Sequence, residues 1–98
     1  MKVYLEKIIK SLNDQEMNFA INKEHTIPFT CKLAILEGLS NNKDLTFPKA
    51  KFAFELLNLI KNHPDKEINF SSEEGALIFD SVYKLYGLNI AGQVCFEE

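Results

Sequence analysis

The sequence predicts a mainly α fold: a compact four-helix domain around a central apolar helix at about 48–62, with at most a short two-stranded element from 17–21 and 90–96. The chain has 98 residues, enough for one domain with its own core, and we take 1–98 as a single globular domain. Hydrophobic residues make up 46% of it, including eight Phe, so a core can be filled. Apolar residues also recur at three- and four-residue spacing between helix-boundary signals.

Two helices are predicted in the first half of the chain. The first covers about 2–13, where apolar side chains share one helical face and lysines and acids share the other. The apolar positions of this face are Tyr4, Leu5, Ile8, Ile9 and Leu12. The second helix runs over about 29–39, and Gly38 or Asn41 can supply the left-handed residue at its end.

The third predicted helix, about 48–62, is apolar over most of its circumference. Pro48 suits its first turn, and the segment starting at His63 stops it. The polar positions form one narrow stripe of Lys51, Glu55, Asn58 and Asn62. A helix with so little polar surface is normally surrounded by other elements, so we expect it at the centre of the domain.

The fourth predicted helix, about 71–86, has clear boundary signals. Ser71 and Glu74 match a capping box, in which each side chain satisfies a backbone N–H of the other residue. Gly87 matches the glycine that follows a Schellman-type helix end, with Leu88 as its hydrophobic partner.

Two segments outside these helices remain ambiguous. Residues 17–21 alternate apolar and smaller or polar side chains, which is typical of a short strand or an extended segment. Pro28 ends any strand pairing there. The tail 88–98 has apolar residues at even spacing, so it is either a strand paired with 17–21 or a strap over the core.

The charge composition argues against nucleic acid as a partner. All eleven basic residues are lysine, and the net charge is −3. Arginine is the usual residue for bidentate phosphate and guanine contacts. The charge is uneven, because residues 1–61 carry +2 and residues 62–98 carry −5. We therefore expect a basic protein partner rather than nucleic acid. No apolar run is long enough for a membrane span, so we expect a cytoplasmic protein without a membrane partner.

The sequence lacks the motifs of catalysis and of cofactor binding. Cys31, Cys95, His25 and His63 do not have the spacing of metal ligands, and we expect two buried thiols and two surface histidines. Cys31 has no orienting motif for nucleophilic chemistry, and the four glycines form no phosphate-binding pattern. We therefore predict a non-catalytic protein with no cofactor, no metal and no small-molecule substrate.

One face of the helix at 71–86 is the candidate binding surface. At about 100° per residue, six residues turn toward the core: Gly75, Ile78, Phe79, Val82, Leu85 and Tyr86. Leu77 instead falls in the middle of the opposite, polar side. It is an interface anchor, a residue covered by the C-terminal strap, or a single exposed leucine. The candidate partner-binding residues are Glu73, Glu74, Leu77, Asp80, Ser81, Tyr83, Lys84, Glu97 and Glu98.

The functional hypothesis from these observations is a small acidic protein of bacterial or phage type that binds and neutralises a basic protein partner. An immunity protein for a nuclease-type toxin, an antitoxin and a phage-encoded inhibitor all fit it, because a compact acidic domain can occlude a basic cleft. The alternative is a self-associating helical adaptor or structural protein with Leu77 on a two-fold axis. A small DNA-binding regulator is a weaker alternative, because three nearby lysines without arginine are a weak nucleic-acid footprint.

Overall fold

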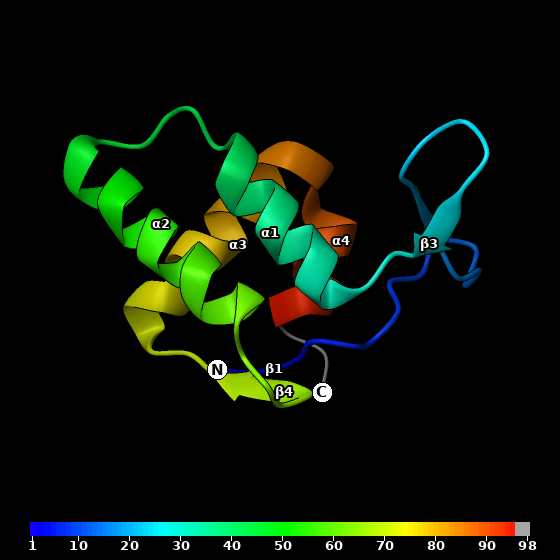
Figure 1. Cartoon of the computed structure of the whole chain (residues 1–98), viewed down its shortest axis with the longest axis horizontal. Helices are drawn as coiled ribbons and strands as arrows, with labels where there is room; N and C mark the ends of the chain where they lie inside the picture. The colour runs from blue at the N-terminus through cyan, green and yellow to red at the C-terminus, as the bar shows by residue number, and fades with distance from the viewer. Residues whose placement is uncertain (96–98) are drawn as a thin grey trace.

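The computed structural model describes residues 1–95 of the chain, which form four helices and two two-stranded antiparallel sheets (Figure 1). The helices are α1 (Cys31–Asn41), α2 (Phe47–Lys61), α3 (Ser72–Tyr86) and α4 (Leu88–Cys95). The strands are β1 (Lys2–Tyr4), β2 (Asn18–Ala20), β3 (Thr26–Pro28) and β4 (Glu67–Asn69). The predicted compact four-helix domain is thus confirmed, although one of its helices lies in a different part of the chain.

The helix at the centre of the domain is α1 and not the segment 48–62. It packs against α2, α3, α4 and β1, whereas α2 packs chiefly on α1 and lies at the outer edge of the helical layer (Figure 1). The small residues of α1, among them Ala34 and Gly38, let its neighbours approach closely. The prediction of a central helix at 48–62 is therefore wrong, although the predicted bounds match α2 within one residue.

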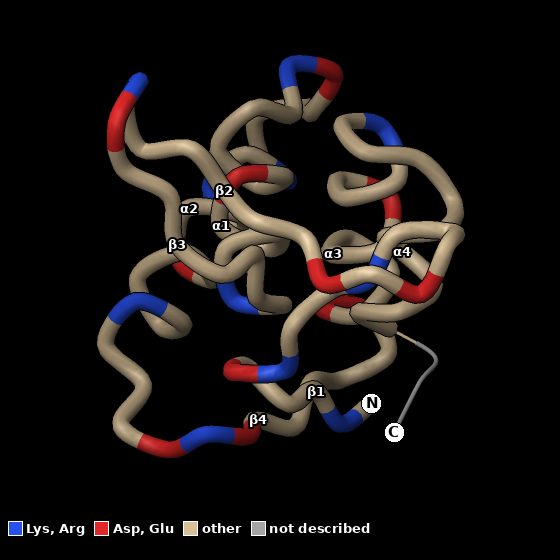
Figure 2. The backbone as a smooth tube through the Cα atoms, turned by 90° about the vertical axis from the view of Figure 1, so that its right-hand side faces the viewer, with Lys and Arg blue, Asp and Glu red and all other residues tan. Residues whose placement is uncertain are grey.

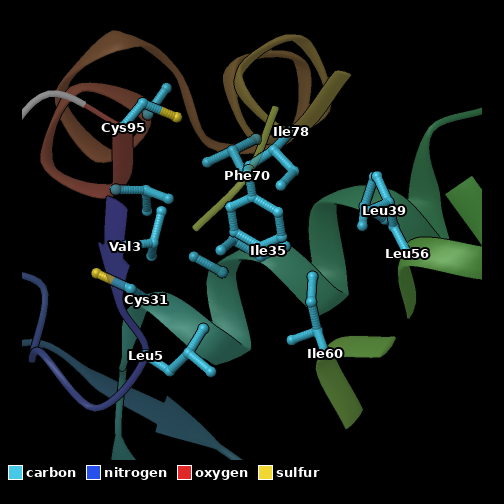
Figure 3. Packing of buried hydrophobic residues seen from close by; sticks show 14 of the residues in the cluster. Val3, Leu5, Cys31, Ile35, Leu39, Leu56, Ile60, Phe70, Ile78 and Cys95 are labelled. Atoms are coloured by element: carbon cyan, nitrogen blue, oxygen red, sulfur yellow. The ribbon is translucent and has the colours of Figure 1, made fainter. Parts of the chain in front are cut away.

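The hydrophobic core surrounds α1. Figure 3 shows Phe70 and Ile78 lying next to Ile35 of α1, while Leu39 and Leu56 lie where α1 faces α2. All five side chains are buried. They come from α1, α2, α3 and the residue after β4, so the core joins segments that are far apart in the sequence.

The N-terminal segment is extended, so the predicted helix at 2–13 is wrong. Val3 and Leu5 are buried while Tyr4 between them is exposed, which is the alternation of a strand. Val3 pairs with Ile68 in the β1–β4 sheet. The Leu5 N–H donates to the Lys66 carbonyl at 2.7 Å. Pairing with distant backbone overrides the local helical spacing of the apolar residues.

The predicted strand at 17–21 is confirmed as β2, but its partner is β3 and not 90–96. Phe19 lies opposite Ile27, and Pro28 is the last residue of β3. The intervening turn is held by Asn22, whose side-chain oxygen accepts the N–H groups of Glu24 and His25 at 2.9 Å each. A local hairpin costs less loop-closure entropy than a pairing across the whole chain.

Residues 88–95 form a helix, so the predicted strand at 90–96 is wrong as far as the described residues reach. Ile90 and Val94 are four residues apart, a spacing that fits both a strand and one face of a helix. Gln93 of this helix is buried, and its side-chain amide both donates to the Lys10 carbonyl (2.6 Å) and accepts the Lys10 N–H (2.8 Å). The Gln93 side chain thus joins α4 to the backbone of the extended N-terminal segment by two hydrogen bonds.

The ends of α1 and α3 follow the sequence signals in part. The capping box of Ser71 and Glu74 is present, and Gly87 has a positive φ of 94° that joins α3 to α4. Leu88 is exposed, so its expected packing against the end of α3 is wrong. α1 also runs past Gly38 to Asn41 and ends at Asn42 in an extended conformation, so neither Gly38 nor Asn41 ends it in a left-handed conformation.

Candidate functional site

A groove of about 790 Å³ lies between α3 and the segment that leads into α2. Its walls come from residues 44–52 on one side and from the polar side of α3 on the other. The lining residues are Asp44, Leu45, Thr46, Pro48, Lys49, Phe52, Glu73, Ala76, Leu77, Asp80 and Lys84. The groove exists because α2 packs on α1 rather than on α3, so the two helices diverge on this side.

Apolar side chains line the interior of this groove. Leu77 is 8% exposed, and Leu45 and Phe52 are partly buried against the hydrophobic core. Leu77 is therefore neither a protruding anchor nor an isolated exposed leucine. It belongs to the concave surface that the 44–52 segment forms over α3. Leu77 shares its side of α3 with charged residues, as predicted, but it is buried in the hydrophobic core, and residues 44–52 rather than a C-terminal strap lie over it.

Charged side chains border the groove. Lys84 lies 3.2 Å from the Asp80 carboxylate and 3.7 Å from that of Asp44, so it links α3 to the loop before α2. Glu73 and Lys49 are exposed, and neither has an ion-pair partner within residues 1–95. Three acids and two lysines leave the lining with a charge of about −1, which favours a cationic group in a partner.

Three other predicted partner-binding residues, Glu74, Ser81 and Tyr83, do not line this groove. The Glu74 carboxylate accepts the Ser71 N–H at 2.7 Å, so it is occupied at the start of its own helix. Ser81 is 1% exposed, and its hydroxyl accepts the Asn42 side-chain amide at 2.9 Å, which makes it a contact between α1 and α3. Tyr83 is exposed and stacks on Phe79 with 5.9 Å between ring centroids. Glu97 and Glu98 lie outside the described residues.

Three of the six expected inward positions of α3 differ. Gly75, Ile78 and Val82 are buried as predicted, but Leu85 is exposed, and Phe79 and Tyr86 are only partly buried. The exposed Leu85 borders a smaller hollow of about 170 Å³ beside the loop at 42–44.

The sequence did not reveal that residues 44–52 contribute half of this groove. Leu45 and Phe52 resemble ordinary helix-start and core residues, and Asp44 is one acid in a polar loop. Their role depends on the angle at which α2 leaves α1, which local spacing does not encode. The Leu-Thr-Phe-Pro stretch at 45–48 marks the start of the helix but not what the helix faces.

Lysines and acids are interspersed along residues 1–95 rather than separated by sign. Figure 2 shows lysines and acids alternating along the backbone, often at neighbouring positions in loops. Lys2 pairs with Glu67 across the β1–β4 sheet, and Lys66 lies 3.9 Å from Glu6. These contacts pair charges of the acidic C-terminal third with opposite charges of the N-terminal segment.

The cysteines and histidines form no reactive group in residues 1–95. Cys31 and Cys95 are buried, as predicted. Burial, and second the neighbouring Cys31, raise the pKa of the Cys95 thiol to about 11, which makes it a poor nucleophile at neutral pH. His25 is exposed, but His63 is partly buried, with its ring 2.9 Å from the Glu67 carbonyl. No group of three or more His, Cys, Asp or Glu side chains in this part of the chain could hold a metal ion.

Comparison with known protein families, curated proteins and solved structures finds no match to this chain. None of the helices in residues 1–95 has the length and apolar character needed to cross a membrane. The case for function rests on the groove between α2 and α3, where apolar and charged side chains meet.

Proposed function

We propose that this chain is a non-catalytic, cytoplasmic protein-binding domain whose groove between α2 and α3 receives a basic segment of a protein partner. The observation that supports this best is the combination of an apolar interior, formed by Leu45, Phe52 and Leu77, with an acidic border. Such an arrangement is typical of a binding pocket that takes one apolar anchor side chain inside a polar rim.

The partner side chains that fit this groove are a medium-sized apolar residue next to a lysine or arginine. The apolar side chain would replace water against Leu77 and Phe52. The neighbouring cation would lie near Glu73 and Asp80, of which Glu73 has no ion-pair partner in the described chain. Binding of this kind weakens as salt screens the charges, so affinity should fall with ionic strength.

Within this proposal, the biological role we favour is neutralisation of the partner by occlusion. Proteins that act on nucleic acid present basic clefts, and an acidic domain that covers such a cleft blocks substrate entry. An immunity protein for a nuclease-type toxin, an antitoxin or a phage-encoded inhibitor would act in this way. The groove binds no cofactor in this proposal, and neither nucleic acid nor a membrane is a partner.

The test compares capture of proteins by three forms of the chain from cells that naturally produce it. The forms are the wild type, the groove variant Glu73→Lys/Asp80→Lys, and a control of equal charge change, Glu16→Lys/Glu24→Lys. The control residues are exposed and lie in the hairpin region, away from the groove. A true partner is retained by the wild type and by the control but not by the groove variant.

The captured partner is then purified and its own activity measured with and without each form of the chain. Inhibition by the wild type and the control, with at least tenfold weaker inhibition by the groove variant, supports the proposal; tenfold corresponds to about 1.4 kcal/mol. The proposal fails if every captured protein binds the groove variant as well as the wild type. It fails in its neutralising part if binding leaves the partner's activity unchanged.

A further inference from the structure

One lysine of the groove joins its two walls. Lys84 of α3 lies 3.2 Å from the Asp80 carboxylate of the same helix and 3.7 Å from the Asp44 carboxylate in the loop before α2. All three residues line the groove. Asp80 is one of the two acids near which the proposed function places the partner's cation. In the free chain, this acid therefore already has a cation beside it.

Asp44 is held near α3 by a second contact that does not involve Lys84. The side-chain amide of Asn42 donates to the buried Ser81 hydroxyl at 2.9 Å, and the side-chain oxygen of Asn42 accepts the Asp44 N–H at 3.2 Å. The side chain of Lys84 is 41% exposed and that of Asp44 78%. Ion pairs this exposed contribute little to stability, because water solvates both charges. Lys84 can therefore leave the two carboxylates while the loop stays in place.

The two carboxylates are better arranged for a guanidinium than for an ammonium group. One Nζ lies near both of them, so Asp44 and Asp80 are close enough to each other to share a single cation. The 3.7 Å contact of Lys84 with Asp44 is longer than a nitrogen–oxygen hydrogen bond of about 2.7–3.2 Å. A planar guanidinium carries five N–H donors in a fixed fork and can donate to both carboxylates at once.

We propose that Lys84 occupies, in the free chain, the place that an arginine of the partner takes between Asp44 and Asp80. The exchange rests on the proposed function and names the cation of the partner segment. The apolar neighbour of this arginine lies against Leu77, which precedes Asp80 by less than one turn of α3. When the arginine binds, the Lys84 ammonium group turns to solvent and exchanges two carboxylates for water. Lys84 thus selects arginine over lysine, because only the better cation displaces it.

Lys49 provides a matched comparison within the same groove. It also lines the groove and is exposed, but it has no ion-pair partner in the described part of the chain. Loss of either lysine makes the lining more negative by one charge, whereas only loss of Lys84 frees two carboxylates. The variants Lys84→Met and Lys49→Met therefore separate the release of carboxylates from the change in net charge.

The experiment titrates the isotope-labelled whole chain with two acetylated and amidated dipeptides, leucyl-arginine and leucyl-lysine, and follows backbone amide shifts by NMR at low ionic strength. In the wild type, shifts at Leu45 and Leu77 should show the arginine peptide binding about threefold more tightly than the lysine peptide. Lys84→Met should gain about a further threefold for the arginine peptide, and Lys49→Met clearly less. Asp44→Asn should abolish the preference for arginine.

The outcomes separate the exchange from the groove function. If Lys84 only held the groove in shape, Lys84→Met would weaken peptide binding, and the exchange would be overturned. Equal affinities of the wild type for the two peptides, or equal gains from Lys84→Met and Lys49→Met, would also overturn it. So would the absence of peptide-dependent shifts at the groove in every form. The groove function itself fails only if capture of the partner is insensitive to Glu73 and Asp80. Unchanged amide shifts outside the groove verify that each variant keeps its fold.

Discussion

The contact between α1 and α3 and the outer face of α2 show two opposite ways in which a helix meets its surroundings. At Gly38, α1 comes so close to α3 that an added Cβ would lie 3.0 Å from the Val82 nitrogen and 3.1 Å from the Ser81 carbonyl carbon. Nearby, the Ser81 hydroxyl accepts a hydrogen bond from Asn42. On the outer face of α2, by contrast, large side chains such as Phe47 extend into solvent.

The difference indicates which parts of the surface are complete within one chain. The α1–α3 contact is closely packed, and its buried hydroxyl is satisfied, so it needs no partner. α2 has apolar residues on both sides, of which only one is covered. Regions of the first kind determine stability, whereas regions of the second kind are candidates for interaction.

The largest expected effect on stability is a difference between substitutions on the inner and on the outer side of α2. Leu56→Ala should lower the free energy of unfolding by about 2–5 kcal/mol, because it leaves a cavity between α1 and α2. Leu59→Ala, three residues away on the exposed side, should change it by no more than about 0.5 kcal/mol. Urea unfolding at low micromolar concentration measures both. Equal losses would show that α2 is covered on both sides within one chain.

A second prediction concerns how closely α1 and α3 pack. Gly38→Ala should cost about 1–3 kcal/mol, since its Cβ meets backbone atoms that cannot rotate away. The matched control is Gly92→Ala in α4, where an added Cβ meets nothing within 4 Å. That substitution should stabilise the domain by about 0.5–1 kcal/mol through its helix propensity. If thermal unfolding shows the same change for both variants, the close approach at Gly38 is wrong.

The smallest expected effect is the pH dependence that arises from Cys95. Its pKa is raised from 9.0 to about 11 in the folded chain, so the unfolded thiol ionises at lower pH than the folded one. This group therefore contributes its full stabilisation below pH 9 and loses it as the pH rises toward 11. The lysines also titrate in this range, so the useful quantity is the difference from Cys95→Ala. The stability difference between wild type and this variant should shrink between pH 9 and 11, and a constant difference would contradict it.

Several local features follow from the sequence alone. The bounds of α1, α2 and α3 are close to those expected, as are the capping box of Ser71 and Glu74 and the positive φ of Gly87. Each depends on residues within one or two turns of the feature. Helix caps and glycine conformations are decided by local sterics and hydrogen bonds, which a short stretch of sequence contains.

The candidate site was predictable only in part. Glu73, Leu77, Asp80 and Lys84 were expected on one side of a helix, and they do line a single groove. The other wall was not expected, because nothing local to Asp44 or Phe52 indicates which helix they face. Ser81 was assigned to the same polar surface, but its hydroxyl accepts a hydrogen bond from the side chain of Asn42. That residue lies nearly forty positions earlier in the sequence.

The sequence by itself determined the helical character of the chain, where three of its helices begin and end, and that its thiols are buried. The tertiary structure decided which of the other segments are strands or helices and which helix is central, because these outcomes depend on contacts with residues distant in sequence. Val3 and Leu5 fit a helix or a strand equally well until Ile68 and the Lys66 carbonyl pair with them. The apolar spacing of residues 90–94 likewise fits a strand or a helix. The hydrogen bonds between the Gln93 side chain and the Lys10 backbone accompany the helix. α1 rather than α2 lies at the centre of the domain. Small residues such as Gly38 let other elements pack closely on several sides of α1, whereas the large side chains of α2 do not.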